Sequence, residues 1–319
     1  MKDYIVRTIK RKTKKKYTYE FRDQGNRLVS RKLSDQYLQG LYLPPALDNV
    51  KINRNKREKV LAIGYDAKKR AQYTYNKKFT EKRSKEKFHH MIKFGESYER
   101  ILKQIQRDLY TEEDTKNKQI ATILKLVIDC SFRVGNDKYT RENKSYGAST
   151  LESRHVSTKG SIVTVEFIGK KGVKNKCIIR NKRLSKNLRK KKKTISKTDR
   201  LFTYRKGSKY YEVRPTDVNS YLKKFGNFST KNFRTWGANI ELIHHLRETD
   251  HTTDKELNEC IDKVAMKLHN TRAVCKSNYL DPRIIESFLY DTDKFLKTFR
   301  SCETKEDYTS KYIQFLKRG

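Results

Sequence analysis

The sequence SIVTVEFIGKKGVKNKCII, residues 161–179, contains two runs that favour β-strands, 161–168 and 173–179. Both runs contain Ile and Val, and the Gly169-Lys170-Lys171-Gly172 connection between them is typical of a hairpin turn. The turn would hold Lys170 at the tip of the hairpin. Helical patterns surround this segment on both sides, so it predicts a small β-element within a mainly helical domain.

The upstream helical pattern extends over 83–110, where apolar residues recur at the period of an α-helix. A second helix is expected from the Thr111-x-x-Asp114 capping pattern to about Gly135, which would place Arg133 at its C-terminal end. Downstream of the hairpin, the same kind of periodicity predicts further helices over 216–226, 230–246 and 257–268, and two more after 283.

Residues 1–82 have a different character. Alternating β-branched and aromatic residues predict strands at YTYEF (17–21), VLAIGY (60–65) and AQYTYN (71–76). We therefore expect an α+β protein with a small β-rich N-terminal domain, residues 1–82, and a larger, mainly helical domain, residues 83–319, that contains the hairpin.

The charge of the chain points to a polyanionic partner. Among 319 residues, 76 are Lys or Arg and 37 are Asp or Glu, which gives a formal net charge of +39. Nucleic acid is the usual partner of so basic a protein, because bound phosphates offset the repulsion among its own charges. Residues 170–200 hold fifteen basic residues and one acid. This composition predicts a solvated or DNA-contacting loop, particularly over 182–193.

Other compositional features exclude several classes of protein. Five scattered cysteines without a Cys-x-x-Cys pair favour a reduced, intracellular protein over a disulfide framework. No stretch is apolar enough for a signal peptide or a membrane span, and no ATP-binding or zinc-protease motif is present. The basic run KRKTKKK, residues 10–16, fits a DNA-contacting arm, a nuclear import signal or a solvated stretch.

Five segments lie in order along the chain: LPPAL with GYDAKKRAQYTY (43–47 and 64–75), FRVGNDKYTRENKSYGASTL (132–151), VEFIGKKGV (165–173), KNFRTWGAN (231–239) and KLHNTRAVCKSNYLDPRI (267–284). Together, over residues 17–290, they resemble the type IB DNA topoisomerases of the small poxvirus, giant-virus and bacterial branch. Residues 277–284 are also similar to the tyrosine segment of the larger nuclear enzymes. The stretch LFTYRKGSKYYEVRPTDVNSYL, residues 201–222, resembles the region that precedes the second catalytic arginine of the small enzymes.

The resemblance implies a catalytic set of five residues. Tyr279 would be the nucleophile that forms a 3′-phosphotyrosyl ester and releases a 5′-hydroxyl strand end. Arg133 and Arg234 would stabilise the phosphorane, for which a planar guanidinium is well suited. Lys170 would be the general acid, and His269 would donate a hydrogen bond to a non-bridging oxygen. The family needs no ATP, metal or other cofactor.

Each of these residues also has an ordinary structural explanation when it is taken alone. Arg133 and His269 could complement the dipoles of helix ends, and Lys170 could be a turn lysine. Tyr279 is one of 20 tyrosines. The catalytic interpretation is favoured only because all five residues occur in the family's order and each lies in a segment that matches the family.

The resemblance also implies DNA contacts in the N-terminal domain. Arg70, Gln72, Tyr73 and Tyr75 match a segment that the small viral enzymes place in the major groove, where Arg and Gln can read base edges. A basic β-strand with ordinary tyrosine alternation explains the same residues. The resemblance further implies that the protein is a monomer that clamps duplex DNA and has no membrane partner.

Some features depart from the poxvirus pattern. His269 and Tyr279 are ten positions apart and Asn278 precedes the tyrosine, as in cellular and nuclear forms, so poxvirus target-site preference is not transferred. The helices after about 290 lie outside the match. The expected location is intracellular and DNA-associated: a virion or cytoplasmic replication site if the protein is viral, and the nucleus otherwise.

Two other functions are open at this point. A tyrosine recombinase uses a related catalytic set, but its second arginine usually follows the pattern His-x-x-Arg, whereas here the segment is Lys231-Asn232-Phe233-Arg234. A non-catalytic basic protein that binds nucleic acid would account for the charge alone.

Overall fold

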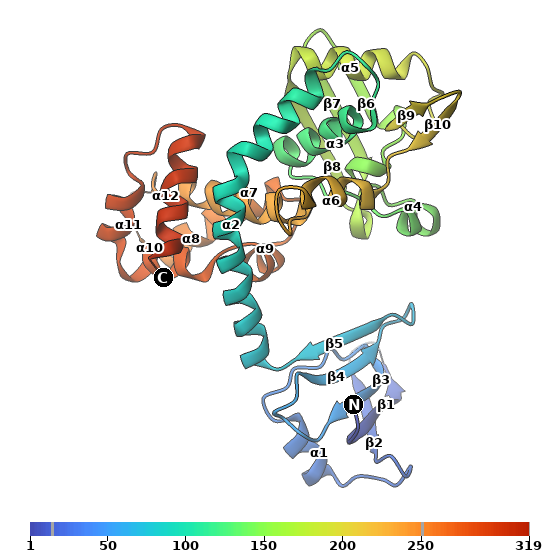
Figure 1. The fold of residues 1–319 in the computed structure, drawn as a ribbon. Coiled ribbons are helices and arrows are strands. Elements are labelled where there is room, and N and C mark those ends of the chain that lie inside the picture. The colour runs from blue at the N-terminus through green and yellow to red at the C-terminus, as the bar shows by residue number, and fades with distance from the viewer. Residues whose placement is uncertain (14–15, 250–251, 319) are drawn as a thin grey trace. The chain divides into compact units, whose positions relative to one another are not determined.

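The computed structural model describes residues 1–13, 16–249 and 252–318. The chain divides into two compact units, Met1–Lys87 and Phe88–Gly319, with the division inside the long helix α2 (Lys77–Tyr110). The first unit is built on an antiparallel sheet and the second is mainly helical (Figure 1). The predicted α+β class is confirmed.

The N-terminal unit is a five-stranded sheet with strand order β2-β1-β3-β4-β5. Every neighbouring pair is antiparallel. The basic run at 10–16 falls partly in β1, and its residues 14–15 lie outside the described part of the chain. The elements are β1 (Tyr4–Lys12), β2 (Tyr17–Arg22), α1 (Arg31–Leu38), β3 (Asp48–Asn53), β4 (Val60–Tyr65) and β5 (Ala71–Tyr75).

The core of this unit forms where three strands place apolar side chains in register. Ile5 pairs with Ile52, which pairs with Ala62 on its other side, and all three side chains are buried. Arg7 is buried on β1, and its Nη2 atom donates to the carbonyl oxygen of Leu47 at 2.9 Å. Strand β5, which carries the candidate DNA contacts, is an edge strand of the sheet.

The second unit packs helices around a three-stranded antiparallel sheet with order β6-β7-β8, and it also has a short hairpin, β9 with β10. Its elements after α2 are α3 (Lys116–Cys130), α4 (Asp137–Asn143), β6 (Val156–Lys159), β7 (Ile162–Ile168), β8 (Lys174–Arg180), α5 (Lys182–Lys192), β9 (Thr203–Lys206), β10 (Lys209–Glu212), α6 (Pro215–Lys223), α7 (Thr230–Leu246), α8 (Asp254–Lys267), α9 (Arg272–Asn278), α10 (Pro282–Tyr290), α11 (Thr292–Phe299) and α12 (Lys305–Lys317).

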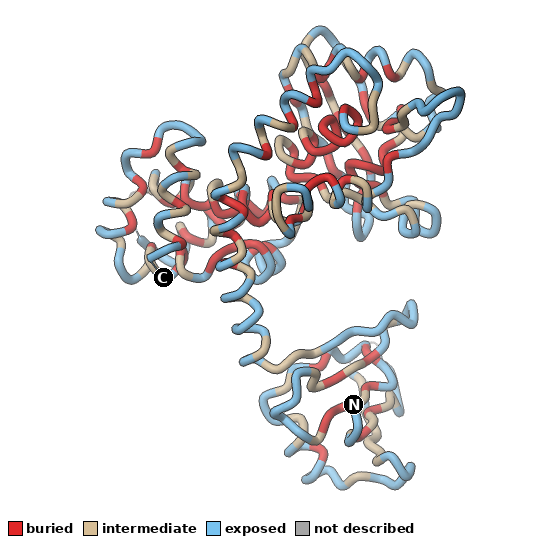
Figure 2. Tube along the Cα trace, viewed as in Figure 1, coloured by how far each residue is buried: buried red, intermediate tan, exposed pale blue. Residues whose placement is uncertain are grey.

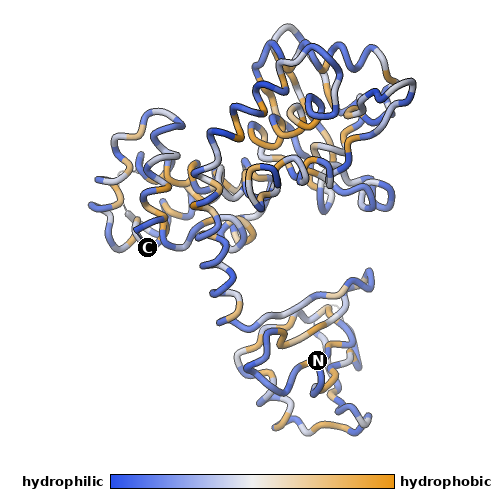
Figure 3. Tube along the Cα trace, in the orientation of Figure 1, coloured by the Kyte–Doolittle hydropathy of each residue, from blue (hydrophilic) through white to orange (hydrophobic). Residues whose placement is uncertain are grey.

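Helix α3 runs through the interior of this unit and is buried on most sides. Much of it is coloured as buried in Figure 2 and as hydrophobic in Figure 3. Its N-cap is Thr115, whose hydroxyl accepts from the Lys118 amide, and it ends at Cys130. The expected Thr111 start and Gly135 end were wrong, as was the start of α2 at 83. The Thr111 capping pattern was misleading because Thr115 supplies the cap of α3. At the other two ends the apolar pattern alone did not mark the limit of the helix.

The predicted hairpin is confirmed as β7 and β8, joined by residues 169–173. Alternate residues of β7, Val163, Val165 and Phe167, point into the core. The ring of Phe167 meets that of Phe132 edge-on, with centroids 4.8 Å apart. This contact joins the hairpin to the segment that follows α3.

The basic tract 182–193 is mostly helix α5, so the prediction of a loop there was wrong. Leu184 and Leu188 lie four residues apart and are both buried, which gives the helix an apolar side that its charge obscures in the sequence. Asn181 caps it by accepting from the Leu184 amide at 2.8 Å. The buried Lys191 pairs with Asp114 at 2.9 Å.

Two of the five cysteines are not free thiols. Cys130 at the end of α3 and Cys177 on β8 form a disulfide, which corrects the expectation of a fully reduced protein. The other three, Cys260, Cys275 and Cys302, are buried and free. The count and spacing of the cysteines could not reveal this bond, because its partners are 47 residues apart and meet only in the folded chain.

Trp236 on α7 is the centre of an aromatic cluster that ties together α2, α7 and α12. Its ring centroid lies 4.9 Å from that of Tyr312 and 5.9 Å from that of Phe94. Gly95 on α2 leaves room for this packing: a Cβ atom there would overlap the Trp236 ring and lie 2.8 Å from Ile313 Cγ1.

We therefore expect Gly95→Ala to lower the free energy of unfolding by about 1–3 kcal/mol, the usual cost of overpacking a core. Gly237→Ala is the matched control, since a Cβ atom at that helical position meets nothing within 4 Å. It should stabilise the protein by roughly 0.5–1 kcal/mol, because alanine restricts the unfolded chain more than glycine does. Urea unfolding of both variants measures these changes in the free energy of unfolding. The same change in both variants would contradict the close packing at Gly95.

Candidate active site

Arg234 lies in the interior of the second unit, on the second turn of α7. Its side chain is 4% exposed, and its Nη2 atom donates to the Leu268 carbonyl oxygen at 3.1 Å and to the Tyr279 hydroxyl at 3.4 Å. The Nε and Nη1 atoms are buried and have no partner within the described residues. Since buried guanidinium donors are normally paired, these two are available for an anion.

Tyr279 is the residue that ends α9, and it is 7% exposed. The guanidinium carbon of Arg234 lies 5.1 Å from the centre of its ring. The main chain on both sides of the tyrosine is held by Asn239 of α7, whose Nδ2 donates to the Tyr279 carbonyl at 2.9 Å and whose Oδ1 accepts from the Asp281 amide at 2.7 Å. One helix thus positions both Arg234 and the phenol.

Arg133 lies in the loop after α3, three residues beyond the end of the helix, and is half-buried. Its carbonyl oxygen accepts from the Ala148 amide at 2.8 Å. Behind it the backbones of Gly135 and Gly147 approach closely: a Cβ atom on Gly147 would lie 2.5 Å from the Gly135 nitrogen. The Arg133 Nη2 atom donates to Asn270 Oδ1 at 2.6 Å.

His269 follows Leu268, the C-cap of α8, and has a left-handed conformation, with φ of 52°. Its imidazole stacks on the ring of Phe132, with centroids 5.8 Å apart and planes 30° apart. Within the described chain, the imidazole forms no hydrogen bond.

Lys170 lies in the turn between β7 and β8, as predicted, and its side chain is exposed. The turn is closed by the Gly169 amide, which donates to the Val173 carbonyl at 2.8 Å, and Asn175 Nδ2 donates to the same oxygen. The structure brings Arg234, Tyr279, Arg133 and the residues after α8 into one contact network. It places Lys170 at the tip of the hairpin and outside that network.

The positive charges of the site act on the phenol. Burial raises the pKa of Tyr279, but the charge and hydrogen bond of Arg234, together with Arg133 and Lys231, outweigh it, so its pKa lies below that of a free tyrosine. Burial and the two arginines also lower the pKa of His269. The phenolate, which is the nucleophilic form of a tyrosine, is therefore more accessible here than at an ordinary tyrosine.

The four predicted DNA contacts of the N-terminal unit lie on or beside β5. Arg70 Nε and Gln72 Nε2 both donate to Asp66 Oδ2, at 2.8 and 3.1 Å, and the bonds from Arg70 lower the pKa of that carboxyl to about 2. Tyr73 and Tyr75 stack with centroids 6.1 Å apart on one face of the strand. The four residues form one local cluster, in which Arg70 forms an ion pair with Asp66.

Known proteins match the chain over most of its length. The catalytic core of eukaryotic DNA topoisomerase I matches residues 76–305. "DNA topoisomerase 1B" of Acanthamoeba polyphaga mimivirus is 30% identical over 297 residues, which cover 88% of this chain and 87% of the relative. "DNA topoisomerase 1B" of vaccinia virus (strain Copenhagen) is 26% identical and covers 66% of each chain. The chain belongs to the type IB DNA topoisomerases.

Family membership makes the protein a type I DNA topoisomerase, an isomerase whose substrate is DNA. The two alternatives, a tyrosine recombinase and a non-catalytic basic protein, are set aside by the same matches. None of the described helices is long and apolar enough to cross a membrane.

Two asparagines that contact the candidate catalytic residues were not predicted from the sequence. Asn239 holds the backbone around Tyr279, and Asn270 accepts from Arg133. Asn239 lies five residues after Arg234 on the same helix, and a fully buried asparagine in a helix is a signal of such a role. That burial cannot be read from the sequence.

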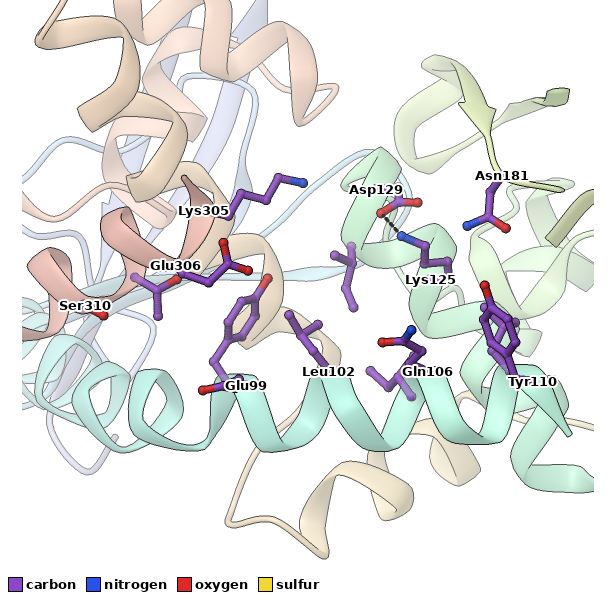
Figure 4. Close-up of a pocket in the computed structure, with 15 residues that line it drawn as sticks. Glu99, Leu102, Gln106, Tyr110, Lys125, Asp129, Asn181, Lys305, Glu306 and Ser310 are labelled. Carbon is purple, nitrogen blue, oxygen red and sulfur yellow. Dashed lines mark hydrogen bonds and ion pairs between the residues drawn. The ribbon is translucent and has the colours of Figure 1, made fainter. Parts of the chain in front are cut away.

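The topoisomerase also has a cavity of about 390 Å³ between α2, α3 and α12. Figure 4 shows its polar groups, among them Lys125 and Asp129, which pair with each other at 2.8 Å. None of the candidate catalytic residues lines it. The network of Arg133, Arg234 and Tyr279 is therefore separate from this cavity.

Proposed function

We propose that this topoisomerase relaxes supercoiled DNA by nicking one strand through a 3′-phosphotyrosyl ester at Tyr279, letting the strand rotate, and resealing it. The observation that supports this most is the distance of 3.4 Å between the Tyr279 hydroxyl and a buried guanidinium, two of whose donors have no partner among the described residues. A phosphate that reached the phenol would meet these donors. Three side chains would then surround the reacting phosphorus.

In the cleavage step, the oxygen of Tyr279 forms a bond to phosphorus while the bond from phosphorus to the 5′ oxygen breaks. The phenol loses its proton, and the 5′ oxygen gains one and leaves as a hydroxyl. Arg133 and Arg234 neutralise the charge that develops on the non-bridging oxygens. The ester retains the energy of the broken bond, so the reverse reaction reseals the strand without ATP.

Lys170 is proposed as the acid that protonates the leaving 5′ oxygen. Its exposed position at the tip of a two-stranded hairpin suits a group that reaches into bound DNA. The two arginines and this lysine carry the charges that a divalent metal supplies in other phosphoryl-transfer enzymes. Our proposal therefore includes relaxation in the presence of EDTA.

We also propose that the N-terminal unit contacts the major groove through Arg70, Gln72, Tyr73 and Tyr75, and that a single chain encloses the duplex. The stacked tyrosine pair, of which Tyr73 is exposed, and the basic charge of the unit support this. Residues 1–80 hold 22 basic and 7 acidic residues, a net charge of +15 (22 minus 7). Affinity should therefore fall steeply with salt.

The test is a covalent trap. The full chain is mixed, in EDTA and without ATP, with a duplex oligonucleotide that loses a short 3′ fragment after cleavage and so cannot be resealed, and the adduct is digested for mass spectrometry. A nucleotide on the peptide that contains Tyr279 supports the proposal. An adduct on another residue, or activity that requires ATP or a divalent metal, would overturn it.

A further inference from the structure

The two residues after Tyr279 lead into α10, and the turn that they form carries a buried charge. Asp281 is fully buried, and it caps α10 by accepting from the Arg283 amide at 3.0 Å. Its own amide donates to Asn239, the residue that also holds the Tyr279 carbonyl. The position of the Asp281 side chain is therefore coupled, through one short stretch of backbone, to that of the proposed nucleophile.

Arg283 neutralises this buried carboxylate with its planar guanidinium. The Nε atom donates to Asp281 Oδ1 at 3.1 Å, and the Nη2 atom donates to Oδ2 at 2.8 Å. Burial lowers the pKa of Arg283, but the hydrogen bonds and charge of Asp281 outweigh it and raise that pKa. Among the described residues this is the one ion pair of Asp281. Since a buried carboxylate is costly without its counterion, Arg283 keeps Asp281 in this position.

The remaining nitrogen of the same guanidinium reaches the C-terminal helix. Arg283 Nη1 donates to the Leu316 carbonyl oxygen, in the last turn of α12, at 3.4 Å. One turn earlier on that helix, Tyr312 packs on Trp236 of α7. Helix α12 thus contacts α7 directly and, through Arg283, the turn that follows the phenol.

We infer that Arg283 is a positioning residue for strand cleavage: it fixes the turn after Tyr279 to α12 and thereby holds the phenol hydroxyl at Arg234. This role rests on that of Tyr279 as the proposed nucleophile. The hydroxyl lies 3.4 Å from Arg234 Nη2, at the outer limit of a hydrogen bond, so a small displacement of the backbone would break this contact. Helix α12 then contributes to the geometry of the site, although no candidate catalytic residue lies on it.

The first test is Arg283→Met, which keeps a long apolar side chain and removes the guanidinium. The single-turnover rate constant for cleavage of a duplex oligonucleotide should fall about 10- to 100-fold, the loss expected when a reacting group is displaced by about 1 Å. The Kd for the uncleaved duplex should stay near wild type. Arg300→Met, at the exposed C-cap of α11, is the matched control and should cleave at the wild-type rate.

Arg283→Lys covers the case in which the methionine variant does not fold. Lysine keeps the charge beside Asp281 but lacks the fork that holds both carboxylate oxygens and Leu316. Its rate constant should fall about 3- to 10-fold, the equivalent of one lost hydrogen bond. Urea unfolding shows which variants are folded, and if only the lysine variant is, the two measurements that follow are made with it.

The pH profile of cleavage separates displacement of the phenol from partial unfolding. Burial raises the pKa of the phenol, but the charges that face it, Arg234 and Lys231 of α7 and Arg133, outweigh burial and lower that pKa. If the phenol moves away from Arg234 in Arg283→Met, its pKa rises, and the rate constant should reach its plateau at a pH about 1 unit higher than in wild type. A fraction of unfolded protein would instead lower the amount of adduct and leave the profile unchanged.

A double-mutant cycle with Asp281→Asn shows whether Arg283 acts through the carboxylate. Asparagine is also a good helix cap, so it keeps the start of α10 and removes the charge. The double variant should cleave no more slowly than Arg283→Met alone, because no buried charge is then left unpaired.

The inference is overturned if either folded variant of Arg283 cleaves at the wild-type rate, if the plateau of the pH profile does not move, or if the losses in the cycle are additive. Failure of the proposed function is a separate outcome, since the wild type would then form no adduct at Tyr279.

Discussion

Tyr279→Phe is expected to abolish relaxation of supercoiled plasmid while it leaves DNA binding intact. Phenylalanine keeps the ring that Arg234 covers and removes only the oxygen that attacks phosphorus. Loss of a nucleophile that forms a covalent intermediate should reduce the cleavage rate constant by at least about 10⁴-fold. A gel assay of relaxation and a filter-binding measurement of Kd on the same preparation check both halves of this expectation.

The matched control is Tyr290→Phe, at a tyrosine of the same unit whose side chain is 84% exposed and lies one helix further on. It should relax plasmid at the wild-type rate. Residual relaxation by Tyr279→Phe within about tenfold of wild type would show that the hydroxyl at 279 is not the nucleophile.

Arg234→Ala is expected to have the next largest effect. It removes the cation that faces the phenol and two buried guanidinium donors that have no partner among the described residues. Loss of donors aimed at a developing charge usually costs about 10²–10³-fold in rate constant. The pKa of Tyr279 should also rise, because burial would no longer be opposed by the charge beside it.

Arg234→Lys separates charge from geometry. A lysine keeps one positive charge but has no planar fork, so we expect a rate constant between those of wild type and Arg234→Ala. Arg100→Ala, at an exposed arginine of α2 that donates to the Phe225 carbonyl, is the control and should cleave normally. If Arg234→Ala cleaved DNA with the wild-type rate constant, Arg234 would have no role in the cleavage step.

Much of the fold could be predicted because its signals are local. The β7–β8 hairpin follows from two β-branched runs around Gly169 and Gly172, and α7 and α8 follow from apolar residues at helical spacing. The candidates Arg133, Arg234 and Tyr279 were found by ordered local motifs. The structure adds that they lie within one network of contacts.

The features that were missed depend on partners distant in sequence. Helix α5 is stable because Leu184 and Leu188 have a core to enter, which a count of its charges does not reveal. The bond from Arg133 to Asn270 spans 137 positions. The left-handed backbone of His269 was also not predicted, because histidine is an uncommon residue in that conformation.

Helix α12 covers Trp236, two residues from Arg234, with the ring of Tyr312. A ribosome releases α7 well before α12, so the tryptophan stays uncovered in the growing chain until residues 305–317 have been made. The surroundings of the second arginine are therefore completed late in biosynthesis. A polypeptide that stops before residue 305 would lack the ring that covers Trp236 beside this arginine.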